Sequence, residues 1–145
     1  MKHIIFACLM MAALPATASP FSIAKSGKYE KMQCDGGACN WLEWTQERVS
    51  QDGNDIIVEG RGKIALSEWE ERRKGEEKMV GEKNVKLTVR CSTSDPEVIF
   101  DGQRKTVDLD GSVNPVTGVY FRVCHNIAPA SSNKFQSIIK KYYGE

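Results

Sequence analysis

Residues 84–91 have the sequence NVKLTVRC, in which apolar and polar side chains alternate without interruption. One parity holds the apolar residues Val85, Leu87, Val89 and Cys91. Lysine, threonine and arginine occupy the other parity. This period of two is typical of a β-strand with one buried face. The segment therefore predicts a half-buried strand that carries a cysteine on its core side.

Further strand patterns lie on both sides of this segment. The turns Asp35-Gly36-Gly37 and Asp101-Gly102 have the composition of hairpin connections. The runs around them and farther along the chain predict strands at residues 29–34, 40–49, 55–59, 97–100, 103–109 and 118–125. Near the C-terminus, helical spacing predicts one apolar stripe that packs on the sheet, formed by Phe135, Ile138, Ile139 and Tyr142.

These patterns predict a single α+β domain at residues 29–145, mostly antiparallel β-sheet with a C-terminal amphipathic helix. Residues 19–28 are small and polar, which suggests a flexible N-terminal arm. Residues 67–78, SEWEERRKGEEK, combine a capping pattern with favourable i,i+4 charge pairs, but Gly75 interrupts them. A short helix and a solvated charged excursion both fit that segment.

Residues 1–18 have the pattern of an export signal. Lys2 gives a positive start, residues 4–14 are uniformly apolar, and Ala16-Thr17-Ala18 fits the small-residue pattern that signal peptidases cleave. The apolar run is too short to span a bilayer. We therefore expect cleavage after Ala18. The expected product is a periplasmic or secreted protein with no stable membrane insertion.

The cysteines that remain after cleavage are Cys34, Cys39, Cys91 and Cys124. An even number in an exported chain favours disulfides, and four cysteines allow three pairings. We expect Cys34–Cys39, which closes a tight loop, and Cys91–Cys124, which joins two predicted strands. Loop-closure entropy gives about 2 kcal/mol for the small ring and about 4 kcal/mol for the large one.

Charge and motifs exclude several function classes. Without Lys2, basic and acidic residues are equal in number, whereas nucleic-acid-binding domains usually show a basic excess or a basic face. We therefore predict no nucleic-acid partner. The chain has no Gly-rich phosphate loop, HExxH or GxSxG motif. The sequence thus assigns no cofactor and no catalytic residue.

Metal and thiol chemistry are also disfavoured. His125 follows Cys124, but neighbouring side chains on a strand point to opposite faces, which opposes a Cys–His dyad. We expect His125 at the surface, at the end of a strand. The cysteines lack the second spaced pair of a zinc site, and Asp108 and Asp110 lack the other ligands of an EF-hand loop. The aspartates are explained by turn chemistry, and no metal site is predicted.

The remaining candidates are aromatic. Trp41, Trp44, Trp69 and Tyr29 lie around the first hairpin and the charged segment, and such residues anchor protein interfaces and stack on sugars. Their alternative role is to fill the core of a small β domain. Trp41 and Trp44 have opposite parity, so on a regular strand one faces inward and the other outward.

These observations predict a small exported, non-enzymatic module that binds a protein or glycan partner of the cell envelope. In its size, expected cellular location and expected disulfides, the chain is similar in general type to small periplasmic inhibitors. The lysozyme inhibitors of Gram-negative bacteria are an example, although their motifs are not recognisable here. The alternatives are a small envelope hydrolase that uses Asp and Glu carboxylates, and a structural accessory of an envelope complex.

Overall fold

The computed structural model describes residues 18–35, 38–67, 79–110, 114–127 and 132–144. The side chains of residues 27–35, 38, 40, 66–67, 79–80 and 132–133 lie outside that description. Residues 1–17 of the export signal predicted at 1–18, the charged residues 68–78 and the candidate Trp69 also lie outside it.

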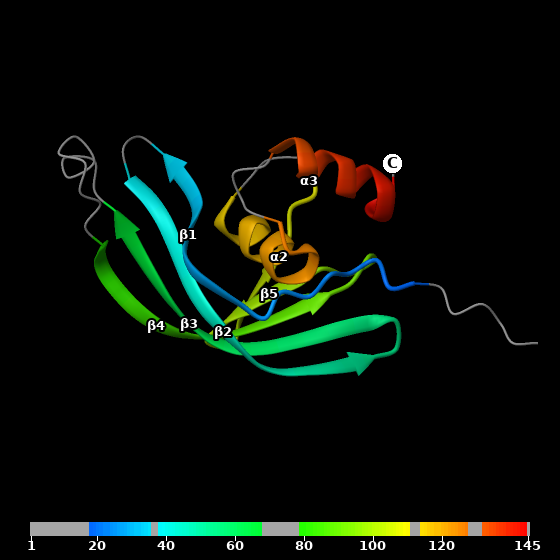
Figure 1. The fold of residues 1–145 in the computed structure, drawn as a ribbon, viewed down its shortest axis with the longest axis horizontal. Helices are drawn as coiled ribbons and strands as arrows, with labels where there is room; N and C mark the ends of the chain where they lie inside the picture. Colours follow the sequence, from blue (N-terminus) through cyan, green and yellow to red (C-terminus); the bar gives the residue numbers. More distant parts are fainter. Residues whose placement is uncertain (1–17, 36–37, 68–78, 111–113, 128–131, 145) are drawn as a thin grey trace, which may run out of the picture.

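An antiparallel sheet of six strands forms the frame of the molecule, in the order β1-β2-β3-β4-β5-β6 (Figure 1). The strands are β1 (Ser26–Asp35), β2 (Ala38–Asp52), β3 (Asp55–Ser67), β4 (Met79–Cys91), β5 (Glu97–Phe100) and β6 (Gln103–Thr106). Each pairs with the next along the chain, so the sheet is a simple meander. The predicted antiparallel sheet and both predicted hairpins are confirmed.

The alternation along β4 places its apolar side chains in the core. Val85, Leu87, Val89 and Cys91 are each at most 4% exposed. Their cross-strand neighbours on the same face include Val58, opposite Val89 on β3, and Val98, opposite Val89 on β5. Both valines are buried as well. One face of the sheet is therefore apolar, as the sequence predicts.

Two glycines let β2 and β3 approach closely. A Cβ atom at Gly60 would lie 2.4 Å from the Thr45 carbonyl oxygen, and one at Gly62 would lie 2.7 Å from the Glu43 carbonyl oxygen. Only glycine fits such an approach without a shift of the backbone. The β2–β3 register also shifts just beyond Gln46. β3 therefore continues through these glycines, whereas the sequence prediction ended the strand at Glu59.

Residues 118–125 are not a strand, so that prediction is wrong. They belong to helix α2 (Pro115–His125), which lies against the sheet (Figure 1). The Asn114 side chain caps the helix by accepting a hydrogen bond from the Thr117 N–H at 2.9 Å. Pro115 occupies the first turn, and Asn126 ends the helix in the left-handed conformation, with φ of 53°.

The burial of α2 explains why it resembles a strand in the sequence. Residues 117–121 and 123–125 are all buried. A helix that is buried on nearly every side has no polar stripe. Its sequence therefore lacks the recurrence of polar residues every 3.6 positions that identifies an exposed helix. What remains visible is its content of valine, tyrosine and phenylalanine, which favours strands. Caps and tertiary burial override that preference here.

The predicted C-terminal helix exists, but it packs on α2. Helix α3 (Ser132–Ile138) continues into the π-helical turn η1 (Ile139–Tyr143) and lies beside α2 (Figure 1). The centroids of the Phe135 ring and the Phe121 ring of α2 are 4.7 Å apart. Tyr143, rather than the predicted Tyr142, joins the apolar cluster. A π turn holds more residues than an α turn, which shifts the inward-facing position. No described helix is long and apolar enough to cross a membrane.

The N-terminal segment lies along the end of α2. The Ser22 N–H donates to the Cys124 carbonyl at 2.9 Å, and the Ala24 N–H donates to the Val123 carbonyl at 3.0 Å. Ala24 is buried, and β1 already begins at Ser26. This segment runs beside α2 in Figure 1 and its backbone is hydrogen-bonded to the helix; the flexibility of residues 19–28 stays a prediction.

One disulfide is described in full. Cys91, at the end of β4, is bonded to Cys124, in the last turn of α2, with Cα atoms 5.5 Å apart. It joins a strand to a helix, not two strands as expected. Cys39 is disulfide-bonded and fully buried, and Cys34 stands opposite it in the β1–β2 register. The side chain of Cys34 lies outside the description, so the Cys34–Cys39 bond stays a prediction.

Candidate functional site

A groove opens between the apolar face of the sheet and the start of α2. Its volume is about 320 Å³, at the lower end of the range typical of ligand sites. Most of its described lining is apolar. The sheet contributes Trp41, Leu42, Ile64, Val85 and Phe100, and the helix contributes Pro115 and Val119.

Strand register explains why side chains from distant parts of the chain meet there. Ile64 of β3 stands between Leu42 of β2 and Lys83 of β4. Side chains directly opposite each other on antiparallel strands project from the same face. Ile64 is 36% exposed, an unusual exposure for a large apolar side chain on the face that forms the core. The groove therefore leaves apolar surface accessible to a partner.

The polar lining of the groove has a net positive charge. Lys83, Asp101, Gln103 and Lys105 are its described polar residues. The Lys83 Nζ lies 3.7 Å from an Asp101 carboxylate oxygen, so these two charges offset each other. In the described part of the chain Lys105 has no ion pair. The rim therefore carries one uncompensated positive charge.

Of the two tryptophans on β2, one lies in the core and the other lines the groove. Trp44 is 1% exposed and belongs to the core cluster, so it is not a surface residue. Its Nε1–H is buried and has no hydrogen-bond partner in the described residues. Trp41 is half-buried and lines the groove. Tyr29 lies in β1, but its side chain is outside the description, as is all of Trp69.

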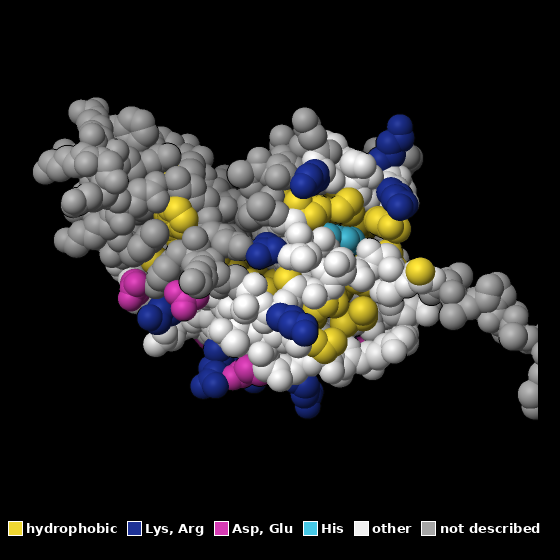
Figure 2. All heavy atoms as spheres, in the orientation of Figure 1, with side chains coloured by type: hydrophobic (Ala, Val, Ile, Leu, Met, Phe, Trp, Pro, Cys, Tyr) yellow, Lys and Arg dark blue, Asp and Glu magenta, His cyan; other side chains and the backbone are white. Residues whose placement is uncertain are grey.

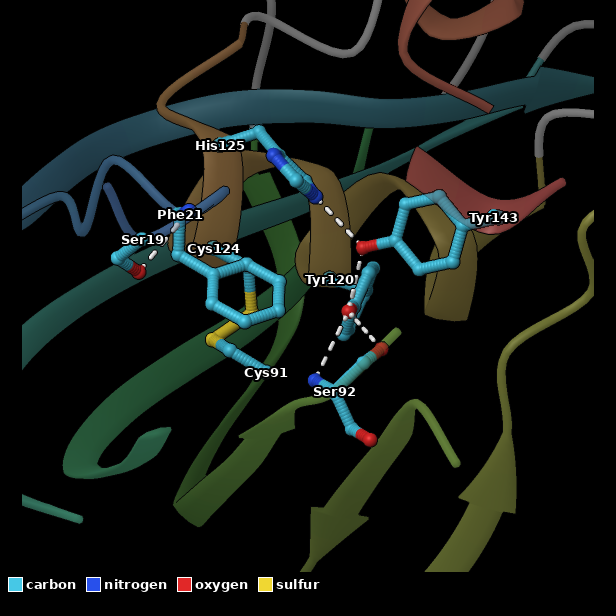
Figure 3. The surroundings of a disulfide bond; sticks show 8 residues. All are labelled: Ser19, Phe21, Cys91, Ser92, Tyr120, Cys124, His125 and Tyr143. Atoms are coloured by element: carbon cyan, nitrogen blue, oxygen red, sulfur yellow. Dashed lines mark hydrogen bonds between the residues drawn. A yellow bond between two sulfur atoms is a disulfide. The ribbon is translucent and has the colours of Figure 1, made fainter. Parts of the chain in front are cut away.

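A second cluster lies beside the Cys91–Cys124 disulfide (Figure 3). His125 Nε2 lies 2.6 Å from the Tyr143 hydroxyl, which lies 2.6 Å from the Tyr120 hydroxyl. The Tyr120 hydroxyl donates to the Ser92 carbonyl at 2.9 Å and accepts from the Ser92 N–H at 3.2 Å. The chain of hydrogen bonds thus connects η1, α2 and the segment that follows β4.

Burial sets the ionisation of this cluster. Desolvation lowers the pKa of His125 to about 4, and a hydrogen bond to the Pro20 backbone opposes part of that shift. Burial also raises the pKa of Tyr120 and of Tyr143 well above the ordinary value. All three side chains are therefore neutral at pH 7. They form a neutral buried network that links Pro20 and η1 to α2.

The expectation of a surface His125 is wrong, since the residue is 7% exposed. The argument from alternating strand faces also fails, because Cys124 and His125 lie on a helix. The thiol of Cys124 is nevertheless consumed by the disulfide with Cys91. A Cys–His dyad at these two residues therefore has no thiolate.

Several of the described carboxylates are engaged in ion pairs and turns. Arg90 contacts Asp55 at 2.7 Å and Asp52 at 3.0 Å. The Asp108 carboxylate accepts from the Asp110 N–H at 3.0 Å, which is the turn chemistry that the sequence predicts for this pair. Within the described ranges no group of three or more histidine, cysteine or acidic residues is arranged to hold a metal ion.

Sequence patterns did not reveal the groove. Ile64 follows the glycines that ended the predicted strand, and Val119 was assigned to a strand. The glycine pair at 60 and 62 is the signal that could have helped, because isolated glycines within a strand pattern indicate close backbone approach. Comparison with protein-family models, curated proteins and solved structures finds no match to this chain.

Proposed function

We propose that this protein is a small exported, non-enzymatic module that binds a protein or glycan partner of the cell envelope. The observation that carries the proposal is the apolar groove between the sheet and α2, with Ile64 exposed inside it. Open apolar surface framed by a few polar groups is typical of binding sites. Inhibition of a partner enzyme is one form that such binding takes.

The cellular location of the protein is part of the same proposal. We propose removal of residues 1–18 and a periplasmic or secreted product with two disulfides. The Cys91–Cys124 bond supports an oxidising compartment, because such bonds are rare in reducing cytoplasm. Binding is favoured over hydrolysis because Asp101, the one carboxylate among the described lining residues, is paired with Lys83. A mechanism with two carboxylates needs a second one.

The test uses two matched substitutions. Ile64 and Val49 are the large apolar side chains that are exposed in the described structure, at 36% and 43%, and only Ile64 lines the groove. Residues 19–145 are screened against a displayed library of random peptides and against a glycan array. We expect Ile64→Asn to abolish binding of the selected ligands and Val49→Asn to preserve it. Equal loss in both variants, or cleavage of the arrayed glycans, would contradict the proposal.

A further inference from the structure

We infer that the groove takes an acidic protein segment anchored by a large apolar side chain. This inference rests on the proposed function and adds the chemical class of the partner. It is carried by two features of the charge distribution and by the polarity of the groove.

The first feature is the charge of the helical layer, defined as residues 114–127 and 132–144. This layer contains Arg122, Lys134, Lys140 and Lys141 and no aspartate or glutamate. The chain as a whole has nearly equal numbers of basic and acidic residues, so the helical layer is positive and the remainder negative. Figure 2 shows dark blue Lys and Arg side chains over the region of α2 and α3.

The second feature is the pattern of ion pairing. In the described part of the chain the sheet arginines have acidic partners: Arg48 with Glu59, Arg61 with Glu47, Arg90 with Asp52 and Asp55, and Arg104 with Glu97. Among the described residues no ion pair forms at Lys105 on the groove rim or at lysines 134, 140 and 141 of the helical layer; sheet lysines 25, 63 and 86 are also without one. Positive potential therefore remains at the groove and on the helical layer.

The walls of the groove indicate which kind of side chain accompanies the acidic residues of the partner. Its described walls are mostly aliphatic and aromatic, and about 320 Å³ suits one or two large apolar side chains. A glycan offers mainly hydroxyl groups, and among the described lining residues only Lys83, Asp101, Gln103 and Lys105 can bond to them. A peptide that combines an apolar anchor with aspartate or glutamate satisfies both the walls and the rim. Its acidic residues would also speed association by electrostatic steering.

The experiment selects peptides from a displayed random library on residues 19–145 and then measures affinities with a synthetic consensus peptide. We expect a large apolar residue flanked by aspartate or glutamate. Replacing those acids by amides, or raising the salt concentration, should weaken binding. Lys105→Gln should weaken it about two- to fivefold. Lys63→Gln is the control, because Lys63 is exposed and precedes Ile64, so it lies on the opposite face of β3.

The outcomes separate this inference from the proposed function. Peptides that depend on Ile64 but show no acidic preference would overturn the inference and leave the proposed function intact. A search that yields no ligand dependent on Ile64 would overturn both. Vesicles of phosphatidylglycerol provide the competing anionic surface. If they bind through lysines 134, 140 and 141 and are unaffected by Ile64→Asn, the anionic partner is a membrane, which contradicts the inference.

Discussion

At the scale of single residues, two tryptophans three positions apart have different roles. Trp44 is fully buried on the inner face, whereas Trp41 is half-buried in the groove. Parity predicted that one would face inward, but it could not say which. Neither face of β2 is cleanly apolar in sequence. The choice depends on Gly62, which leaves room for Leu42 and Trp44 to pack across β3.

Trp44→Ala should lower the free energy of unfolding by about 3–5 kcal/mol, because it removes a large buried ring. Trp44→Phe should cost less than about 2 kcal/mol, since it also removes an N–H whose unpaired burial is unfavourable. Urea unfolding followed by circular dichroism measures both. Trp41→Phe is the control and should change stability little. Equal losses for the alanine and phenylalanine variants of Trp44 would refute this description of the site.

His125 should make stability depend on pH. Burial lowers its folded-state pKa from 6.5 to about 4, so the unfolded chain takes up a proton first as the pH falls. Its contribution is fully present above pH 6.5 and is lost as the pH falls to about 4. At about 1.4 kcal/mol per pKa unit the total loss is about 3 kcal/mol.

Urea unfolding at a series of pH values tests this contribution, with His125→Phe as the comparison. The variant lacks the titrating ring, so its stability should fall less steeply between pH 6.5 and pH 4. Both proteins also lose carboxylate ion pairs on acidification, and the difference between the two curves isolates the histidine. Parallel curves would mean that His125 titrates alike in the folded and unfolded states.

At the scale of elements, the strands were predictable and the central helix was not. Period-two alternation at Val85–Cys91 and the Asp101-Gly102 turn are local signals, and the structure confirms both. α2 depends on burial by the sheet, α3 and the N-terminal segment, which no local pattern records. Asn114-Pro115 has the composition of a turn and also the pattern of a helix start, so this pair alone does not predict α2.

The disulfide fixes α2 to the sheet, so its removal should be costly. Cys91 and Cys124 are separated by 33 residues, and loop-closure entropy for a ring of that size is about 4 kcal/mol. The double variant Cys91→Ala/Cys124→Ala should lose about that amount of unfolding free energy in urea titrations. A loss below about 1 kcal/mol would show that α2 is held by packing alone.

The second predicted disulfide and the cleavage site can be tested together by mass. The unreduced, denatured protein recovered from the exporting cell should match residues 19–145 less four hydrogens. It should also resist alkylation, because every cysteine that remains would be oxidised. One alkylated pair would contradict the Cys34–Cys39 bond, and a retained N-terminus would contradict export by cleavage.

At the scale of the whole molecule, the net charge is near zero, but basic and acidic residues are distributed unevenly between the helical layer and the rest of the chain. Composition alone argued against a nucleic-acid partner, since basic and acidic residues balance. The fold gathers α2, α3 and η1, which contain no acidic residue, in one layer and pairs the sheet arginines with carboxylates. The groove could not be predicted either, because it is formed by strands far apart in the chain and by a helix assigned to a strand.

The central claim is that the groove is the binding site, and a titration followed by NMR tests it most directly. The probe is 8-anilinonaphthalene-1-sulfonate, which joins an apolar ring system to an anionic group. Amide resonances of the isotope-labelled protein should shift at Ile64, Phe100, Lys105 and Val119, and Ile64→Asn should remove these shifts. Shifts confined to the opposite face, around Lys63 and Thr88, or no shifts at all, would contradict the claim.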